Sequence, residues 1–471
     1  MTPAFSNLIG TGTPILTLSD AAQDIYDSVR DLPIVSPHGH CDPRWFAENT
    51  PFADPVEVLI HPDQGVLRML YSQGVSLEDL GVGVAAHQRE GRAIFRTFAR
   101  HFHKFRGTPT DLWMATTLAR IFGITAPLNA DNADAVYDKI DAEIKSTQMY
   151  PHALLASFNI EVLATTDSAL DDLAHHKAAR KHKLRGKVVP TFCPDAVLDP
   201  RRGDFKANVV KLAEITDQDT SSFEGYLEAL RDRRAYFMAY GATATVHSLP
   251  ELGTCYMTER RAATLFAKAM GGKIAPKEAQ SLYGHMLTEM AQMSAEDGLV
   301  MQIHAGTRVN TNKEMFERFG PNTGADVPQS VNFIDGLDAL LNRVGHSRDI
   351  NIVVFTPDAS ACERELAPMA GHWPALRLGS PWRFRHGVNG IARYLDHVVE
   401  STGYWNLAGF SDNTRAFMSI PARHDLWRRG VSLHLAQQRQ RGVLGRGDVD
   451  EIAQMLCRDL AIDAYKFSSF V

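Results

Sequence analysis

The chain has 471 residues, of which 44% are hydrophobic and 22% are charged, a globular composition with room for one large domain or two to three ordinary ones. Lys and Arg number 49 against 55 Asp and Glu, so the net charge is −6. This mild acidity argues against nucleic acid or an anionic membrane as the main partner.

Two further features concern the cellular compartment. No run approaches about 18 apolar residues, and the first 20 residues lack a basic stretch before an apolar core, so we expect neither a membrane span nor a secretory signal. The five cysteines are widely spaced and form no C-x-x-C pair. They favour a reducing cytoplasm over a disulfide framework or a cysteine zinc site.

The first predicted elements are a helix over Ala21–Arg30 and a short buried strand from Pro33 to Pro37. The strand ends in His38-Gly39-His40, and both imidazoles lie on one face because side chains alternate along a strand. Two converging imidazoles are a ready chelate for a divalent metal. The alternative is that an H-x-H pair arises by chance in a chain with 19 histidines.

After this strand the pattern becomes helical for roughly 110 residues, with no convincing strand before about residue 150. The predicted helices are Pro55–Ile60, Gly65–Tyr71, Gly91–Phe105, Asp111–Phe122 and Ala133–Ser146. We therefore expect a helical insertion over residues 41–150 that follows the first strand.

Beyond the insertion, apolar runs alternate regularly with helix-like stretches and, with the first strand, make eight predicted strands. The seven later runs are Glu161–Thr166, Lys187–Phe192, Ala242–His247, Leu299–His304, Asn351–Phe355, Ala375–Leu378 and Asn406–Phe410. Eight strands in βα alternation favour an α/β fold of the (β/α)8 barrel type over an open doubly wound sheet. We expect residues 1–40 to hold the N-terminal helix and strand one, and residues 151–471 the rest of the barrel with C-terminal helices.

Polar side chains follow the ends of several predicted strands, where the βα loops of a barrel build the active site. Strand one ends in His38 and His40, strand four in His247, strand five in His304, and strand eight in Asp412 to Arg415. A single strand-end histidine can equally be a core residue bonded to a backbone carbonyl. Three strands that end in histidine weaken that alternative.

Several longer motifs resemble one known family. The matching segments are DLPIVSPHGHCDP, RMLYSQGVSLEDLGV, FRGTP, ATTD, LTEMAQMSAEDGLVMQIHAG, ERFGPNTGADVP, RELAPMAGHWPALRLGSPW and TRAFMSIPARHDLWRR. With these the chain resembles the uronate isomerase (glucuronate isomerase) family of the amidohydrolase superfamily over nearly its whole length.

The resemblance implies a TIM-like barrel of the metal-dependent hydrolase type, a divalent metal with zinc as the expected ion, cytoplasmic location and a homo-oligomer. It also implies a small sugar-acid substrate and an aldose–ketose isomerisation, D-glucuronate to D-fructuronate or D-galacturonate to D-tagaturonate. By the same resemblance the metal ligands are His38, His40 and Asp412. The implied catalytic residues are Asp412, His247, His304 and Arg415.

The chain also departs from the family pattern at several positions around the expected site. Cys193 stands where the family has an arginine for the substrate carboxylate, and Gln64 and Gly65 replace a histidine and a tyrosine. Val246 replaces an aspartate before His247.

The remaining departures follow strands five, seven and eight. Val309 replaces an arginine, with Arg308 one place early, and Arg383 replaces a second tryptophan beside Trp382. Asn413 occupies the position of the family's aspartate, so Asp412 serves only if a bulge turns it inward. The expected substrate-binding residues are thus Arg308, Arg383, Trp382, Asn413 and Cys193.

Three functions remain open at this level. The first is the isomerase, with Arg308 or Arg383 binding the carboxylate. The second is a diverged hydrolase, lyase or decarboxylase that keeps the metal centre and acts on a non-uronate substrate. The third, a silent binding protein, is opposed by the converging imidazoles, for which an inactive site has no physical need.

Overall fold

The computed structural model describes residues 16–382 and 385–471. Arg383, predicted to bind substrate, and most of the N-terminal segment predicted not to be a secretory signal lie outside the described residues. The chain enters through helix α1 (Asp20–Val29), which buries Ala22, Ile25 and Val29 on one face, and continues into strand β1 (Ile34–Ser36). Both elements confirm the predicted helix and strand.

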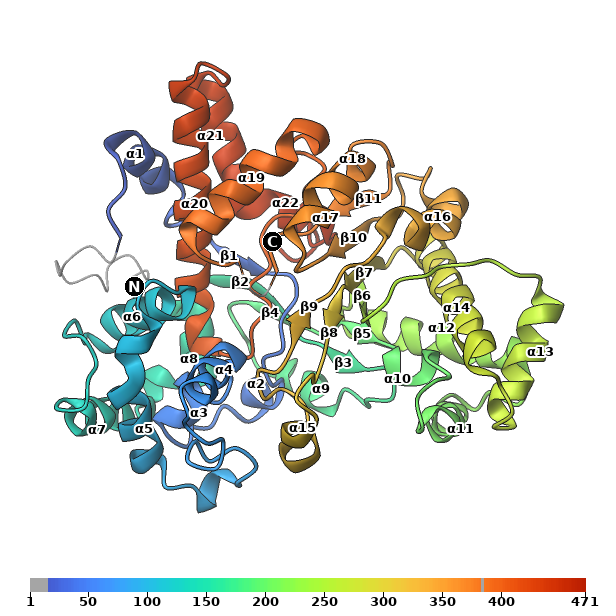
Figure 1. The fold of residues 1–471 in the computed structure, drawn as a ribbon, viewed down its shortest axis with the longest axis horizontal. Helices are drawn as coiled ribbons and strands as arrows, with labels where there is room; N and C mark the ends of the chain where they lie inside the picture. The colour runs from blue at the N-terminus through green and yellow to red at the C-terminus, as the bar shows by residue number, and fades with distance from the viewer. Residues whose placement is uncertain (1–15, 383–384) are drawn as a thin grey trace.

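The segment between β1 and β2 contains helices joined by loops and no strand among its described residues, and it lies at the lower left of Figure 1. Its apolar residues share one core with residues of β1 and β2 and of the C-terminal part of the chain, and within it Phe98 packs against Phe95 and Phe105. The helices are α2 (Arg44–Glu48), α3 (Pro55–Leu59), α4 (Gln64–Ser72), η2 (Ala86–Gln88), α5 (Gly91–His101), η3 (Phe102–Phe105), α6 (Pro109–Phe122), α7 (Ala133–Ile144), η4 (Thr147–Met149) and α8 (Pro151–Ser157). The division of the chain into three domains stays a prediction.

The strands then run parallel in chain order. The main ones are β2 (Ile160–Ala164), β3 (Asp167–Ser168), β4 (Lys187–Val189), β5 (Phe192–Cys193), β6 (Ala244–Leu249), β7 (Val300–Ala305), β10 (Ile352–Phe355) and β11 (Leu376–Leu378). They form two ladders, β1-β2-β4 and β11-β10-β7-β6-β5-β3. The Thr165 N–H donates to the Val189 carbonyl and the Asp167 N–H donates to the Thr191 carbonyl, and these bonds join the two ladders. Predicted strand two therefore consists of β2 and β3, and predicted strand three consists of β4 and β5, each with a short interruption. Pro190, which has no N–H to donate, lies at the second break.

The eighth predicted strand is the least regular. Leu407 makes an isolated parallel bridge to Leu378, and Gly409 then takes a φ of +72°, which ends the extended backbone. Beyond it, the His40 N–H donates to the Thr414 carbonyl at 2.9 Å. This bond ties the end of strand eight to the end of strand one, and the order matches a (β/α)8 barrel.

Apolar side chains on the two faces of the strands belong to separate cores. Val35, Val162, Val189, Val300 and Val353 come from five strands and share the interior core. Their neighbours in the strands, such as Met301, Ile303 and Val354, share a second core with the surrounding helices. Residues that alternate along these strands therefore point into the barrel or toward the helices.

The remaining helices cover the outside of the sheet, and the red C-terminal helices stand at the top of Figure 1. They are α9 (Ala174–Ala179), α10 (Asp195–Leu198), α11 (Phe205–Thr216), α12 (Phe223–Ala239), α13 (Glu259–Met270), α14 (Pro276–Asp297), α15 (Lys313–Phe319), α16 (Phe333–Val344), α17 (Ala359–Ala361), η5 (Cys362–Leu366), α18 (Ala367–Ala370), α19 (Val388–Thr402), η6 (Phe417–Ser419), α20 (Ile420–Gln440), α21 (Arg446–Gln454), η7 (Met455–Asp459) and α22 (Leu460–Ala464). In the described part of the chain, no helix combines the length and apolarity needed to cross a bilayer.

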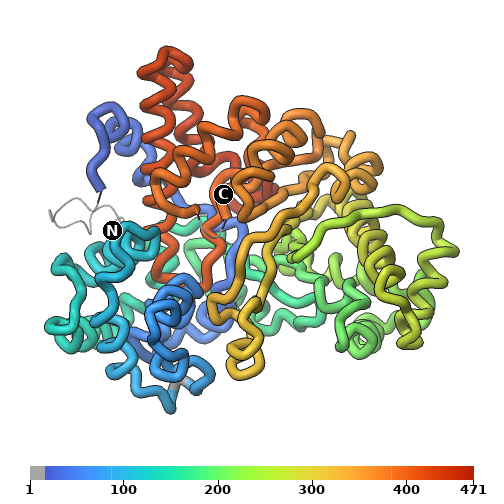
Figure 2. The backbone as a smooth tube through the Cα atoms, viewed as in Figure 1, coloured from blue at the N-terminus to red at the C-terminus, as the bar shows by residue number. Residues whose placement is uncertain are grey.

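One long excursion after β7 reaches back to the insertion. It contains β8 (Thr307–Arg308), α15 and β9 (Val327–Pro328), and Figure 2 shows it in gold beside the blue helix α4. Arg68 of α4 donates from Nε to the Gly324 carbonyl at 2.8 Å and from Nη2 to the Asp326 carbonyl. The insertion and the loop after strand five therefore form one wall above the barrel mouth.

A candidate active site at the barrel mouth

Three histidines meet at the C-terminal ends of β1 and β7. The ring centroids of His38 and His304 lie 4.6 Å apart, and those of His38 and His40 lie 5.1 Å apart with the rings nearly perpendicular. His304 also stacks on Phe355 at 4.4 Å and contacts the Trp382 ring at 4.9 Å. We call His38, His40, His304 and Asp412 the inward cluster.

Strand register explains why His304 joins this cluster and His247 does not. His304 pairs with Phe355, a member of the interior core, whereas His247 pairs with Ile303, a member of the helix-side core. Paired residues on adjacent strands share a face, so His247 points toward the helices. Its Nε2 lies 3.2 Å from the Thr245 hydroxyl, and burial lowers its pKa to about 3. The structure therefore does not bring the predicted catalytic His247 to the site.

Asp412 lies beside the histidines and is fully buried. Its Oδ2 lies 3.1 Å from Nε2 of His424, while its Oδ1 has no hydrogen-bond partner among the described residues. Burial lowers the pKa of His38 to about 4, and the Asp412 carboxylate only partly opposes this shift. Asn413, directly after Asp412, has a φ of +42° and so takes the left-handed conformation. The role of Asp412 as a site residue stays a prediction.

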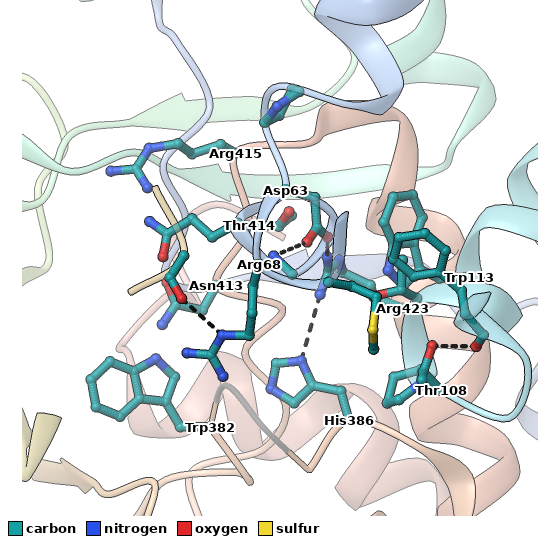
Figure 3. Close-up of a pocket in the computed structure, with 18 of the residues that line it drawn as sticks. Asp63, Arg68, Thr108, Trp113, Trp382, His386, Asn413, Thr414, Arg415 and Arg423 are labelled. Carbon is teal, nitrogen blue, oxygen red and sulfur yellow. Dashed lines mark hydrogen bonds and ion pairs between the residues drawn. The ribbon is translucent and has the colours of Figure 1, made fainter. Parts of the chain in front are cut away.

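A cavity of about 410 Å³ opens between the inward cluster and the helical insertion (Figure 3). Its lining combines barrel loops with the starts of two insertion helices, α4 and α6. The lining residues are His40, Pro62, Asp63, Gln64, Gly65, Arg68, Met69, Phe105, Thr108, Pro109, Thr110, Trp113, Gly324, Trp382, His386, Asn413, Thr414, Arg415 and Arg423. Among the predicted site residues, His40, Trp382, Asn413 and Arg415 line this cavity.

Comparison with known proteins places the chain in one family. The family model described as glucuronate isomerase matches residues 12–467. The chain is 46% identical to a uronate isomerase of Mesorhizobium japonicum, over 94% of this chain and 96% of that protein. It is also similar to a uronate isomerase of Rhizobium meliloti, at 44% identity over 94% and 96% of the two chains.

The chain belongs to the glucuronate isomerase family. Two solved structures agree with this assignment. The glucuronate isomerase of Caulobacter crescentus is 40% identical and superposes with a TM-score of 0.94 over 98% of both chains. The uronate isomerase of Thermotoga maritima is 26% identical, with a TM-score of 0.91 over 97% of this chain and 100% of that one. The predicted family and the predicted barrel fold are both confirmed.

Arg308, one of the two arginines predicted to bind the substrate carboxylate, lies outside the cavity lining. Arg308 is exposed on β8, where it pairs with Val327 of β9, and Val309 beside it is 51% exposed. Cys193 lies on β5, and burial raises the pKa of its thiol well above the ordinary value. Val246 pairs with Gln302 on the interior face of β6, deeper than the mouth.

Sequence reasoning missed several polar residues of the cavity. Arg423 of α20 donates from Nη2 to Asp63 Oδ2 at 2.7 Å and from Nε to the Ser419 hydroxyl at 2.8 Å. Arg68 and Arg423 both stand in motifs that carried the family resemblance, RMLYSQGVSLEDLGV and TRAFMSIPARHDLWRR. Both lie in helical segments far from any strand end. The search for polar residues at strand ends therefore could not identify them.

The predicted metal ligands His38, His40 and Asp412 lie near one another at the barrel mouth. Across residues 16–382 and 385–471, no group of three His, Cys, Asp or Glu side chains is arranged to hold a metal ion. The inward cluster nevertheless contains the donor types that zinc prefers, imidazole and carboxylate. Nδ1 of His38 and Oδ1 of Asp412 are both buried without a hydrogen-bond partner in the described chain. The residues present therefore fit a divalent ion in chemistry, and the ion itself stays a prediction.

Proposed function

We propose that the protein interconverts aldouronates and ketouronates, taking D-glucuronate to D-fructuronate and D-galacturonate to D-tagaturonate. The observation that carries this proposal is the glucuronate isomerase match over residues 12–467. Relatives named uronate isomerase match along almost their full length, which favours the isomerase over a hydrolase, lyase or decarboxylase on the same barrel.

The reaction moves a proton between C2 and C1 of the open-chain sugar through an enediol. It requires a base near C2 and positive charge or hydrogen-bond donors near the developing oxyanion. We assign the proton transfer to Asp412, whose unpartnered Oδ1 is buried beside the histidines. Arg415 lines the same cavity and would stabilise the oxyanion. Trp382, which lines the cavity, and His304, which packs against it, would exclude water from this end.

We further propose that His38, His40 and Asp412 hold a divalent metal, with zinc as the expected ion. Support comes from the low pKa of His38, about 4, which keeps its imidazole neutral and able to donate a lone pair at neutral pH. A bound ion would polarise the carbonyl and hydroxyl oxygens of the sugar. Metal analysis of wild-type protein and of the His38→Ala variant tests this assignment. About one equivalent in the wild type and a loss in the variant are expected.

The activity itself is tested by incubating the protein in D2O with D-glucuronate and with D-galacturonate, and by following ketose formation and deuterium uptake by NMR. Isomerisation predicts the ketose and exchange at the transferred carbon-bound position. His38→Ala should abolish both signals. Cleavage products, or no product from either uronate with metal-loaded protein, would reject the isomerase.

We also propose a cytoplasmic location and a homo-oligomeric state. The five cysteines are all free, as expected for a reducing compartment. Sedimentation equilibrium of the purified protein measures the oligomeric state. A mass corresponding to one 52.2 kDa chain at micromolar concentration would reject the oligomer.

A further inference from the structure

The shape of the proposed substrate sets a requirement on the cavity. In an open-chain hexuronate the reacting carbons C1 and C2 lie at one end, and the carboxylate lies at the other. Proton transfer and carboxylate binding must therefore occur at opposite ends of the site. This inference rests on the proposed isomerase function.

The cavity has two chemically different ends (Figure 3). Trp382 and Asn413 lie on one side, where Trp382 contacts His304 and Asn413 follows Asp412 in the chain. Arg423 and Trp113 lie on the other side, where the insertion closes the cavity. The first side adjoins the inward cluster, so the second is the side that the carboxylate would reach.

Arg423 is held rigidly at this second end. Its guanidinium lies 5.2 Å above the Trp113 ring and donates to Asp63 and to Ser419. Nη1 lies 3.5 Å from Nδ1 of His386, which accepts because arginine has only donors. A guanidinium has five N–H groups, so two remain without a partner among the described residues. A pre-ordered arginine with donors left over is suited to a carboxylate.

The ion pair with Asp63 does not cancel the positive character of this end. Asp63 caps helix α4 and accepts the N–H groups of Gly65 at 2.7 Å and Val66 at 3.2 Å. Helix α6 also begins at the cavity, where Thr108 and Thr110 line the wall. The N-terminus of a helix favours an anion through its partial positive charge. Arg68 differs, because its Nε and Nη2 donate to backbone carbonyls of the loop after strand five.

We propose that Arg423 binds the carboxylate of the sugar acid and thereby makes the site select acidic sugars. The guanidinium edge meets the carboxylate, Asp63 and Trp113 fix its orientation, and the start of α6 adds a second positive feature. Arg423 replaces Arg308, which is outside the cavity, as the residue expected to supply this charge.

The test measures binding of two non-reacting ligands. L-gulonate is D-glucuronate reduced at C1 and keeps the carboxylate, whereas D-glucitol has none. Wild-type protein should bind L-gulonate more tightly. Arg423→Met should weaken L-gulonate binding by about tenfold or more and leave D-glucitol within about twofold, because only the carboxylate contact is lost. Arg423→Lys should recover part of the L-gulonate affinity.

Asp63→Asn is the matched control, since it breaks the ion pair and keeps the arginine. Because the guanidinium then loses the carboxylate that orients it, L-gulonate binding should weaken, but by less than in Arg423→Met. If Arg423→Met and Asp63→Asn each lost as much affinity for D-glucitol as for L-gulonate, the Arg423–Asp63 ion pair would serve only to shape the cavity wall. That result would overturn the inference. Wild-type turnover of D-glucuronate together with unchanged L-gulonate binding in Arg423→Met would overturn this inference alone. No turnover and no L-gulonate binding by the wild type would overturn the proposed function as well.

Discussion

His304 and His247 stand near the ends of neighbouring strands, and the sequence treats them alike. In the structure they lie on opposite faces of the sheet, because His247 pairs with Ile303 and not with His304. An offset of one residue places one imidazole among the inward cluster and the other against the helices. A histidine at a strand end therefore indicates a site residue only when the face of the sheet that it occupies is known.

The two histidines also differ in their surroundings. His304 packs against rings that border the cavity, His38, Phe355 and Trp382. His247 is fully buried and is influenced by the charge of Arg234, a residue of the outer helix α12. The first environment borders the cavity, and the second is that of a buried core residue.

The largest effect should come from the carboxylate of the inward cluster. Asp412→Asn removes the proposed base, so kcat should fall by about 10²–10⁴-fold in the ketose assay. Asp358→Asn is the matched control, because Asp358 also follows a strand and instead caps helix α17. Similar activities in the two variants would contradict the assignment of Asp412.

The pair of histidines provides the direct test of the comparison. His304→Gln should lower kcat/KM by about 10- to 100-fold, since it disturbs the packing around the reacting end. His247→Gln should leave kcat/KM within about threefold and act mainly on stability. Steady-state kinetics and thermal unfolding of both variants separate these effects. A greater loss of activity in His247→Gln than in His304→Gln would contradict the prediction that His304, and not His247, acts at the site.

The pH dependence of stability tests whether His247 is buried as a neutral core residue. The pKa of His247 is about 3 in the folded protein against an ordinary 6.5, so between these values only the unfolded chain binds the proton. Its contribution to stability is complete above about pH 6.5 and is lost as the pH falls, by at most about 1.4 kcal/mol per pH unit. His247→Gln should therefore make unfolding free energy less dependent on pH between 6.5 and 4. Parallel denaturation curves for wild type and variant across this range would contradict the burial of a neutral imidazole.

The smallest effect should come from Arg308. Its side chain is exposed on β8 outside the cavity lining, so Arg308→Ala should change kcat/KM for D-glucuronate by less than about twofold. A tenfold rise in KM would restore the sequence-based prediction that Arg308 binds the carboxylate.

Much of the architecture could be predicted from local pattern. The insertion helices follow 3.6-residue periodicity and clear caps such as Asp63, Thr108 and the glycine at position 123. Seven of the eight predicted runs form ladder strands, because short apolar runs between helices have few other ways to be buried. The eighth run was harder to predict, since the positive φ at Gly409 and the bridge at Leu407 depend on neighbours far away in the chain.

Local pattern and motifs were enough to predict the family, the alternation of strands and helices, and the positions of His38, His40 and Asp412 near strand ends. Which side chains meet depends on long-range packing. The face of His247 depends on its register with β7, and the place of Arg423 depends on the packing of α20 against the insertion. Residues 360 positions apart, such as Asp63 and Arg423, are brought together by packing, which no local period encodes.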